Sequence, residues 1–152
     1  MTHSRKLACA ALFLLAACHH RPPATAVGSD EARALLLNRN WLDVAPKHRD
    51  DKLRVFRFVP DMGGGVYQDR TLFFGTFELF RFTASGDEIV FDLVHTNETR
   101  RSRYFIERIQ PAAPGDFDLR LTLADSPRGP SVYYGWQADG GNLDARLTPR
   151  GE

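Results

Sequence analysis

The sequence has little cysteine and no long apolar run. Of its 152 residues two are cysteine, Cys9 and Cys18, so a framework of several disulfides is excluded. The longest apolar stretch, from Leu7 to Ala17, is about half of the ~20 residues that a transmembrane helix needs. Folding does not depend on either feature, because the roughly 130 residues that follow are enough to bury about two-thirds of their surface in one core.

The chain also lacks a net charge of either sign. Twenty Lys and Arg side chains stand against 19 Asp and Glu, which leaves a formal charge of +1. Without an excess of positive charge there is no field to attract a polyanion, and we expect no nucleic-acid partner. Aromatic side chains make up 11% of the residues and are spread over the whole domain, which argues for a folded domain rather than a disordered one.

Motifs for catalysis and metal binding are missing as well. The chain contains no Gly-x-Ser-x-Gly nucleophile motif. Gly63-Gly64-Gly65 is not followed by Gly-Lys-Ser/Thr, so we interpret it as a turn and not as a phosphate loop. His48 and His95 have no His or Cys partner two or four residues away. We therefore predict no catalytic residue, no metal and no cofactor, and we keep an enzyme of unknown class as a remote alternative.

What is present begins at the N-terminus, where three features follow one another. Arg5 and Lys6 precede the apolar stretch, Leu15-Ala16-Ala17-Cys18 ends it, and a polar, proline-containing segment follows. This order resembles the signal peptide and lipobox of a bacterial lipoprotein, which is cut before a cysteine that carries acyl chains. The resemblance implies a signal peptide at 1–17 and a lipidated Cys18 that opens a flexible linker to residue 28. Because His19 is not an aspartate, it further implies the periplasmic face of the outer membrane in the cell envelope.

Residues 29–152 predict one domain with a short helix and many strands. Ser29-Asp30-Glu31 supplies an N-cap and early acids for a helix that runs to about Leu37. After this helix, segments rich in aromatic and β-branched residues alternate with turn signals, which is typical of an antiparallel all-β domain. A polar turn is expected at 97–101. The predicted strands are 41–44, 53–59, 71–82, 89–95, 104–109, 117–123, 132–136 and 143–147.

Short connections between these strands leave little room for crossovers. Sequential strands should therefore pair as a meander, and a meander of this size tends to close into a small antiparallel β-barrel. A short helix, then Leu37 and Trp41, then serial hairpins resembles the lipocalin-like (calycin) group, whose opening strand carries Leu-x-Gly-x-Trp; here Arg39 stands at the glycine position. A two-sheet β-sandwich is the alternative.

The surplus of aromatic side chains suggests where a ligand binds. Aromatics fall on both faces of 71–82, so this strand is predicted to be apolar toward the lumen and toward a covering helix or partner. We predict that the protein does no chemistry and binds a small apolar or amphipathic ligand in the lumen. The alternatives are an interior filled by side chains and an envelope structural, protein-interaction or inhibitor module with an exposed apolar patch. The candidate lumen residues are Trp41, Phe58, Phe80, Phe91 and Tyr104, with Arg57 or Arg81 as the polar contact.

Overall fold

The computed structural model describes residues 24–112, 115–138 and 143. The predicted signal peptide, Cys18 and the predicted last strand beyond Leu143 lie outside this part of the chain. The elements in chain order are β1 (Thr25–Ala26), α1 (Ser29–Leu36), β2 (Asn40–Leu42), β3 (Leu53–Val59), the 3₁₀ turn η1 (Pro60–Met62), β4 (Gly64–Arg70), β5 (Gly75–Ser85), β6 (Glu88–Leu93), β7 (Glu98–Arg108), β8 (Leu119–Leu123) and β9 (Val132–Gly135).

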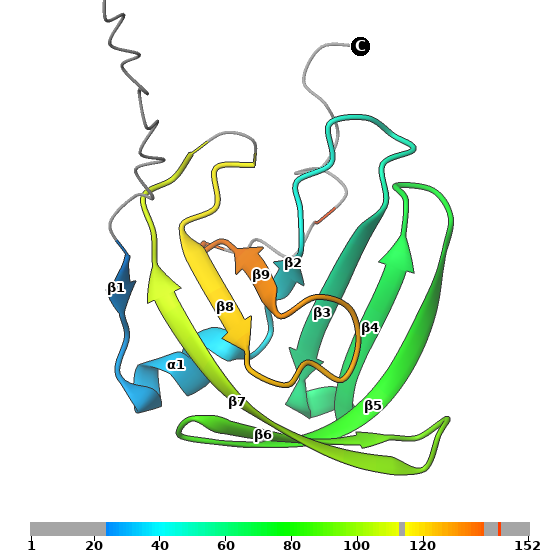
Figure 1. Ribbon diagram of the computed structural model, residues 1–152, viewed down its shortest axis with the longest axis vertical. Helices are drawn as coiled ribbons and strands as arrows, with labels where there is room; N and C mark the ends of the chain where they lie inside the picture. The colour runs from blue at the N-terminus through cyan, green and yellow to red at the C-terminus, as the bar shows by residue number, and fades with distance from the viewer. Residues whose placement is uncertain (1–23, 113–114, 139–142, 144–152) are drawn as a thin grey trace, which may run out of the picture.

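Eight of the strands, β2 to β9, close into an antiparallel barrel (Figure 1). Each strand pairs with the next one along the chain, and β9 returns to β2 through Leu42 and Tyr134. The predicted all-β meander barrel with a short N-terminal helix is therefore confirmed. The alternative of a two-sheet sandwich is wrong, because a sandwich would leave free strand edges where β2 and β9 pair here.

A ninth strand, β1, lies outside the barrel. It pairs with Glu107 and Arg108 of β7. Since Arg108 also pairs with Leu119 of β8, β1 occupies the other edge of β7, past the end of β6. The sequence places these two residues in the linker, because a strand of this length is too short to show a period-2 pattern.

Alternation of side chains explains which face of β8 is buried. Leu119, Leu121 and Leu123 are fully buried in the barrel interior, whereas Arg120 points outward and pairs with Glu107 at 2.8 Å. The three leucines therefore share the inward face of the predicted strand 117–123. Phe117 does not belong to it, because β8 begins two residues later and Phe117 packs against Trp136 at a ring distance of 4.7 Å.

Three strand predictions differ from the structure. The strand expected at 71–82 is β5, which begins only at Gly75, because the Thr71 amide bonds to the Phe74 carbonyl and makes 71–74 a turn. Strand β4 was not expected, since Gly64 and Gly65 read as part of a turn and contribute no side chain to a pattern. The segment expected as a polar turn at 97–101 is mostly the first part of β7, which is exposed on both faces there. The turn itself lies at 94–97, and its last residue, Asn97, has a positive φ of 53°.

Helix α1 closes one end of the barrel. Asp30 and Glu31 lie in its first turn, where negative charge is favourable, and the N-cap is Gly28 instead of the expected Ser29. Ala32 and Leu36 are buried in the interior cluster. The Leu36 carbonyl also accepts a hydrogen bond of 3.1 Å from the Trp41 indole nitrogen, so the helix end is fastened to a core side chain.

The connection between β8 and β9 closes the opposite end. Figure 1 shows it swinging from β8 across the front of β3. Its Arg128 makes two hydrogen bonds, of 2.8 and 2.9 Å, to the carboxylate of Glu78 on β5. The Tyr133 hydroxyl donates a hydrogen bond of 3.0 Å to the Arg128 carbonyl. The barrel interior is therefore covered at both ends.

A second apolar cluster covers part of the outer wall. It lies over β2, β3 and β9 and consists of Leu42, Leu53, Val55, Phe117 and Trp136. The Trp136 indole nitrogen donates a hydrogen bond of 2.8 Å to the Gly115 carbonyl, which holds the β7–β8 connection against the wall. Within the described residues, no such cluster covers the outer wall over β4 and β5. The candidate site lies on this uncovered part of the wall.

Candidate functional site

The five predicted lumen residues all lie inside the barrel. Trp41, Phe58, Phe80, Phe91 and Tyr104 are each at most 3% exposed. Three of them form a ring cluster, with centroid distances of 5.6 Å for Phe58–Phe80, 5.4 Å for Phe80–Phe91 and 6.0 Å for Phe58–Phe91. Phe56 and Tyr133, which the sequence analysis did not single out, join this cluster. Packed side chains thus occupy the space that the lumen prediction assigns to a ligand.

The two predicted polar contacts lie on the other side of the wall. Arg57 and Arg81 alternate with the inward-facing Phe58 and Phe80 along β3 and β5, so they project from the outer face. The structure therefore separates the predicted cations from the predicted aromatic lining.

The barrel mouth beneath the β8–β9 connection is polar, and its charges are paired. Arg54 lies 3.2 Å from Asp43 and 3.7 Å from Asp69. Burial raises the pKa of Tyr67, and the bond to Glu78 raises the pKa of Arg128. These pairs connect β3 with β4 and with the residue after β2, and β5 with the β8–β9 connection, at this mouth. Among the described residues there is no group of three His, Cys, Asp or Glu side chains arranged to hold a metal ion.

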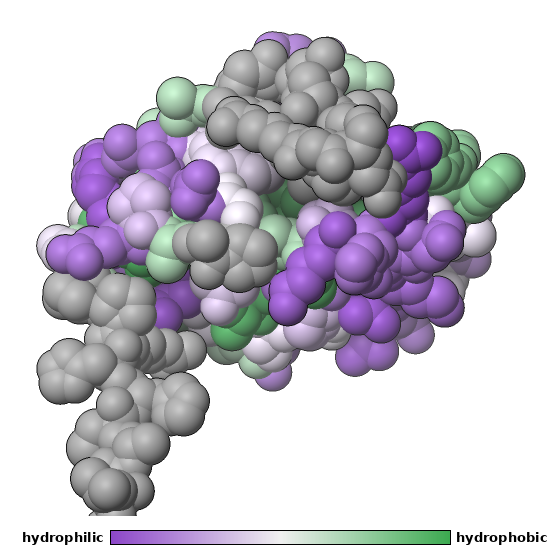
Figure 2. Space-filling view, turned by 90° about the horizontal axis from the view of Figure 1, so that it is seen from above, coloured by the Kyte–Doolittle hydropathy of each residue, from purple (hydrophilic) through white to green (hydrophobic). Residues whose placement is uncertain are grey.

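Large apolar side chains are exposed on the outer wall along β5. Phe77 and Leu79 of this strand are 68% and 53% exposed, although Phe80 and Phe82 beside them pack inward. The prediction of apolar side chains on both faces is confirmed within β5, whereas Phe73 and Phe74, which it also included, precede the strand. Figure 2, seen from above, shows a green projection at the right-hand edge, the side on which Figure 1 places the β4–β5 turn. Exposed apolar side chains gathered in this way mark a binding surface more often than scattered ones do.

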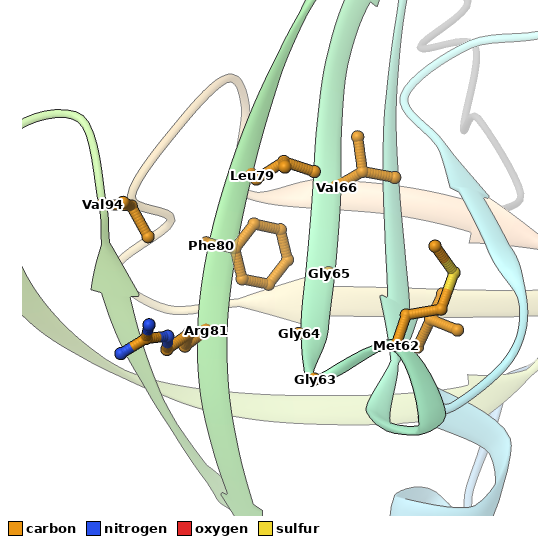
Figure 3. A pocket seen from close by; sticks show the side chains of 10 residues that line it. Met62, Gly63, Gly64, Gly65, Val66, Leu79, Phe80, Arg81 and Val94 are labelled. Carbon is orange, nitrogen blue, oxygen red and sulfur yellow. The ribbon is translucent and has the colours of Figure 1, made fainter.

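A hollow of about 290 Å³ lies at the lower end of this surface, between η1 and the strands β4 and β5. In Figure 3 the backbone of Gly63 to Gly65 crosses its centre, with Met62 on the right, Val94 on the left, and Leu79 and Val66 along the upper edge. Three of these residues share one cross-strand row, because Val66 pairs with Leu79 and Val94 follows the β6 residue that pairs with Phe80.

The glycines make this hollow possible. Gly63 ends η1 with a φ of +76°, which a side chain would strain. A Cβ at Gly64 would lie 2.2 Å from the Phe80 carbonyl oxygen, and one at Gly65 would lie 2.4 Å from the Phe80 ring. No side chain therefore fills the centre of the hollow. The turn predicted from these glycines exists, but Gly64 and Gly65 also start β4 and form the floor of the site.

Arg81 supplies a positive charge at the lower left rim of the hollow (Figure 3). Its cross-strand neighbour is Asp92, whose carboxylate accepts a hydrogen bond of 2.9 Å from the Thr99 hydroxyl. Within the described part of the chain, the Arg81 side chain makes no ion pair and no hydrogen bond. An apolar hollow with a solvated guanidinium at its edge suits a molecule that has an apolar chain and an anionic group.

Sequence reasoning found part of this site and missed the rest. It named Arg81 and identified the double-faced strand that carries Leu79. It did not find Met62, Val66 or Val94, because they come from three different segments that only the strand register brings together.

No protein-family model, no curated protein and no solved structure matches the chain. In the described residues, no helix has the length and apolar character needed to cross a membrane.

Proposed function

We propose that this chain is a non-catalytic lipoprotein of the bacterial cell envelope, anchored through Cys18, whose barrel binds an amphipathic molecule on its outer wall. One observation carries the binding part of this proposal. The interior is filled and covered at both ends, whereas the β4–β5 wall has an apolar hollow with Arg81 at its rim. At about 290 Å³ the hollow is at the small end of ligand sites, so it suits one aliphatic chain better than a fused ring system.

The anchor part of the proposal rests on the sequence before the domain. Leu15-Ala16-Ala17 precedes Cys18 after a basic and then apolar segment, and a lipidated cysteine would keep the domain at a membrane. Two or more acyl chains on one residue make release very slow, since each buried methylene contributes ~0.8 kcal/mol. Mass spectrometry of the membrane fraction should find a diacylated or triacylated Cys18 as the first residue. A soluble protein that starts elsewhere would refute the anchor.

The binding part is tested with a dansyl-labelled medium-chain fatty acid and its methyl ester. We expect saturable binding of the acid with a rise in dansyl emission. Arg81→Gln should weaken binding of the acid about tenfold and leave binding of the ester unchanged, because a charge-assisted hydrogen bond contributes ~1.5 kcal/mol or more. Leu79→Gln should weaken both probes, because Leu79 lines the apolar part of the hollow.

Arg101→Gln is the matched control for the loss of a positive charge. Arg101 is also exposed on the outer wall, but it is paired with Glu88 at 2.9 Å and lies away from the hollow. This variant should bind both probes like the parent. Equal binding by the parent, Arg81→Gln and Leu79→Gln would place the probe elsewhere and contradict the proposed site.

A second candidate function is a protein-interaction module of the envelope. The observation that favours it is the exposed apolar surface itself, which continues from the hollow along Leu79 and Phe77 to Phe74 at the β4–β5 turn. A partner would bury this row of side chains, and loss of binding to both lipid probes would leave this candidate standing. It would then predict a complex that is weakened by Phe77→Ser and not by Arg101→Gln.

A further inference from the structure

The register of the barrel leaves the first part of β5 without a neighbour on one side. The part of β5 up to Phe80 pairs with β4, and the part from Phe80 onward pairs with β6. Residues 75–79 therefore have β4 on one side and none of the described strands on the other. Such an overhang results from the stagger between strands that closes a barrel. We refer to residues 75–79 as the free edge of β5.

The hydrogen bonds of the neighbouring strands show which residues direct their backbone groups toward this edge. In an antiparallel ladder both backbone groups of a residue point to the same side, and successive residues alternate. The Asp43 amide donates to the Arg54 carbonyl at 3.0 Å, so the even-numbered residues of β3 bond toward β2 and the odd-numbered ones toward β4. Carried across β4 by the register, this alternation makes the even-numbered residues of β5 bond to β4.

The β4–β5 turn has the same alternation. The Thr71 amide donates to the Phe74 carbonyl at 2.7 Å, two positions beyond the pair that Asp69 forms with Thr76. Gly75 and Phe77 therefore direct their N–H and C=O groups away from β4. No described residue forms a hydrogen bond with these four groups. A row of unpaired strand groups is complementary to the backbone of another extended chain.

The free edge of β5 lacks the residues that usually prevent strand addition. Free edges are commonly protected by lysine, by proline or by unpaired charge. Strand β7 has a similar overhang, since β8 pairs with it only from Tyr104 onward, and three arginines lie there in residues 98–103. The free edge of β5 has no Lys, Arg or Pro. Its one charge, Glu78, is neutralised by two hydrogen bonds of 2.8 and 2.9 Å from Arg128.

The two sides of the free edge differ in polarity. On the outer wall Phe77 and Leu79 are exposed. On the inner side a space of about 370 Å³ lies between the edge, the 94–97 turn and the β8–β9 connection. Its polar lining residues are Tyr67, Thr76, Glu78, His95, Thr96 and Arg128. A chain paired with the edge would place its side chains alternately on the apolar and the polar side.

We infer that the free edge of β5 binds an extended segment of a partner protein by β-strand addition. The segment has an apolar residue opposite Phe77 and a polar residue on each side of it. These polar residues are uncharged, because Glu78 and Arg128 already neutralise each other. In this binding mode backbone hydrogen bonds provide affinity and alternate side chains provide specificity. The inference goes beyond the proposed ligand site and needs neither that site nor the anchor, since Gly75 and Phe77 do not line the hollow.

The test uses the full chain and the fluorescein-labelled peptide Thr-Val-Thr-Phe-Thr-Val-Thr, with blocked ends. The matched control peptide has the same side chains but carries an N-methyl group on its central phenylalanine, which removes one N–H. We expect saturable binding of the first peptide by fluorescence anisotropy. The N-methyl peptide should bind about tenfold more weakly, because it leaves the Phe77 carbonyl without a partner.

Amide hydrogen exchange of the protein locates the bound peptide. The Phe77 amide should exchange freely in the protein alone and at least about tenfold more slowly with the peptide bound. The Glu78 amide is the internal control, because it bonds to β4 and should be protected in both states. Phe77→Pro removes the edge N–H and leaves the bonds to β4 intact. It should bind the peptide more weakly than Phe77→Ala, which loses the ring but keeps the N–H.

Four results would overturn the inference. No saturable binding of the unmodified peptide would refute it outright, and equal binding of the two peptides would refute backbone pairing. Binding without protection of the Phe77 amide would place the peptide elsewhere. Protection of the Phe77 amide without peptide, increasing with protein concentration, would identify a second copy of the chain as the partner. None of these results would change fatty-acid binding at the hollow, so the two proposals fail separately.

Discussion

Replacing Phe56 by alanine tests whether the barrel interior is a packed core. Phe56 is 1% exposed, and five aromatic rings surround it with centroids 4.9 to 6.1 Å away. Truncation of a buried phenylalanine costs about 3 to 5 kcal/mol through lost burial and the cavity that remains. Since the whole domain is stabilised by about 5 to 15 kcal/mol, the variant should retain a fold but lose a large part of its stability.

The assay is urea and thermal unfolding followed by tryptophan fluorescence. A loss of this size should lower the melting temperature by about 10 to 20 °C for a domain of this length. The matched control is Phe77→Ala, which removes the same ring from an exposed position and should cost less than about 0.5 kcal/mol. Benzene should partly restore the stability of Phe56→Ala by occupying the new cavity, and it should not stabilise the parent.

The reasoning would be refuted by either of two outcomes. If Phe56→Ala and Phe77→Ala cost the same, the interior rings are not packed as the ring distances imply. If benzene stabilises the parent protein, the barrel already has a vacant apolar space. That result would support the prediction that a ligand binds in the lumen.

Three other variants test the polar contacts of the barrel. Tyr104 is buried, and its hydroxyl has no hydrogen-bond partner among the described residues, so Tyr104→Phe should raise stability by about 1 kcal/mol, and a lower urea midpoint would contradict this. Tyr133→Phe should instead lose about 1 kcal/mol, since it removes the bond to the Arg128 carbonyl. Burial raises the pKa of Tyr133 above that of an unfolded tyrosine, which is about 10. The neutral hydroxyl therefore stabilises the fold below that pH, and stability should fall as the pH rises further, less steeply in Tyr133→Phe. Arg128→Ala should cost about 1 to 2 kcal/mol and speed amide hydrogen exchange in the β8–β9 connection, whereas the exposed Arg101→Ala should do neither.

Strands with one buried and one solvated face could be predicted from the sequence. Leu119, Leu121 and Leu123 alternate with polar residues and all point inward, and the meander of short connections predicted the closed barrel. The strands that were missed lack this signal for physical reasons. The first two residues of β4 have no side chains, and the first part of β7 extends past the barrel with both faces in water.

The candidate site was harder to predict than the fold because it depends on register. Alternation predicts that Leu79 and Arg81 share a face, but it does not predict that this face is the outer one. The hollow forms because Gly64 pairs with Val59 and leaves an empty position between Met62 and Leu79. No local pattern contains that information. The interior is filled because ten phenylalanines follow residue 18, and several of them, with Tyr133 and Trp41, point toward one axis.

The central claim is that an amphipathic molecule binds outside the barrel wall and not within it. A crystal structure of the protein soaked with a terminally brominated medium-chain fatty acid would test it most directly, because bromine is located by its anomalous signal. We predict a bromine peak among Val66, Leu79 and Met62, with the carboxylate within hydrogen-bonding distance of Arg81. A peak inside the barrel among Phe56, Phe58 and Phe91 would contradict the claim.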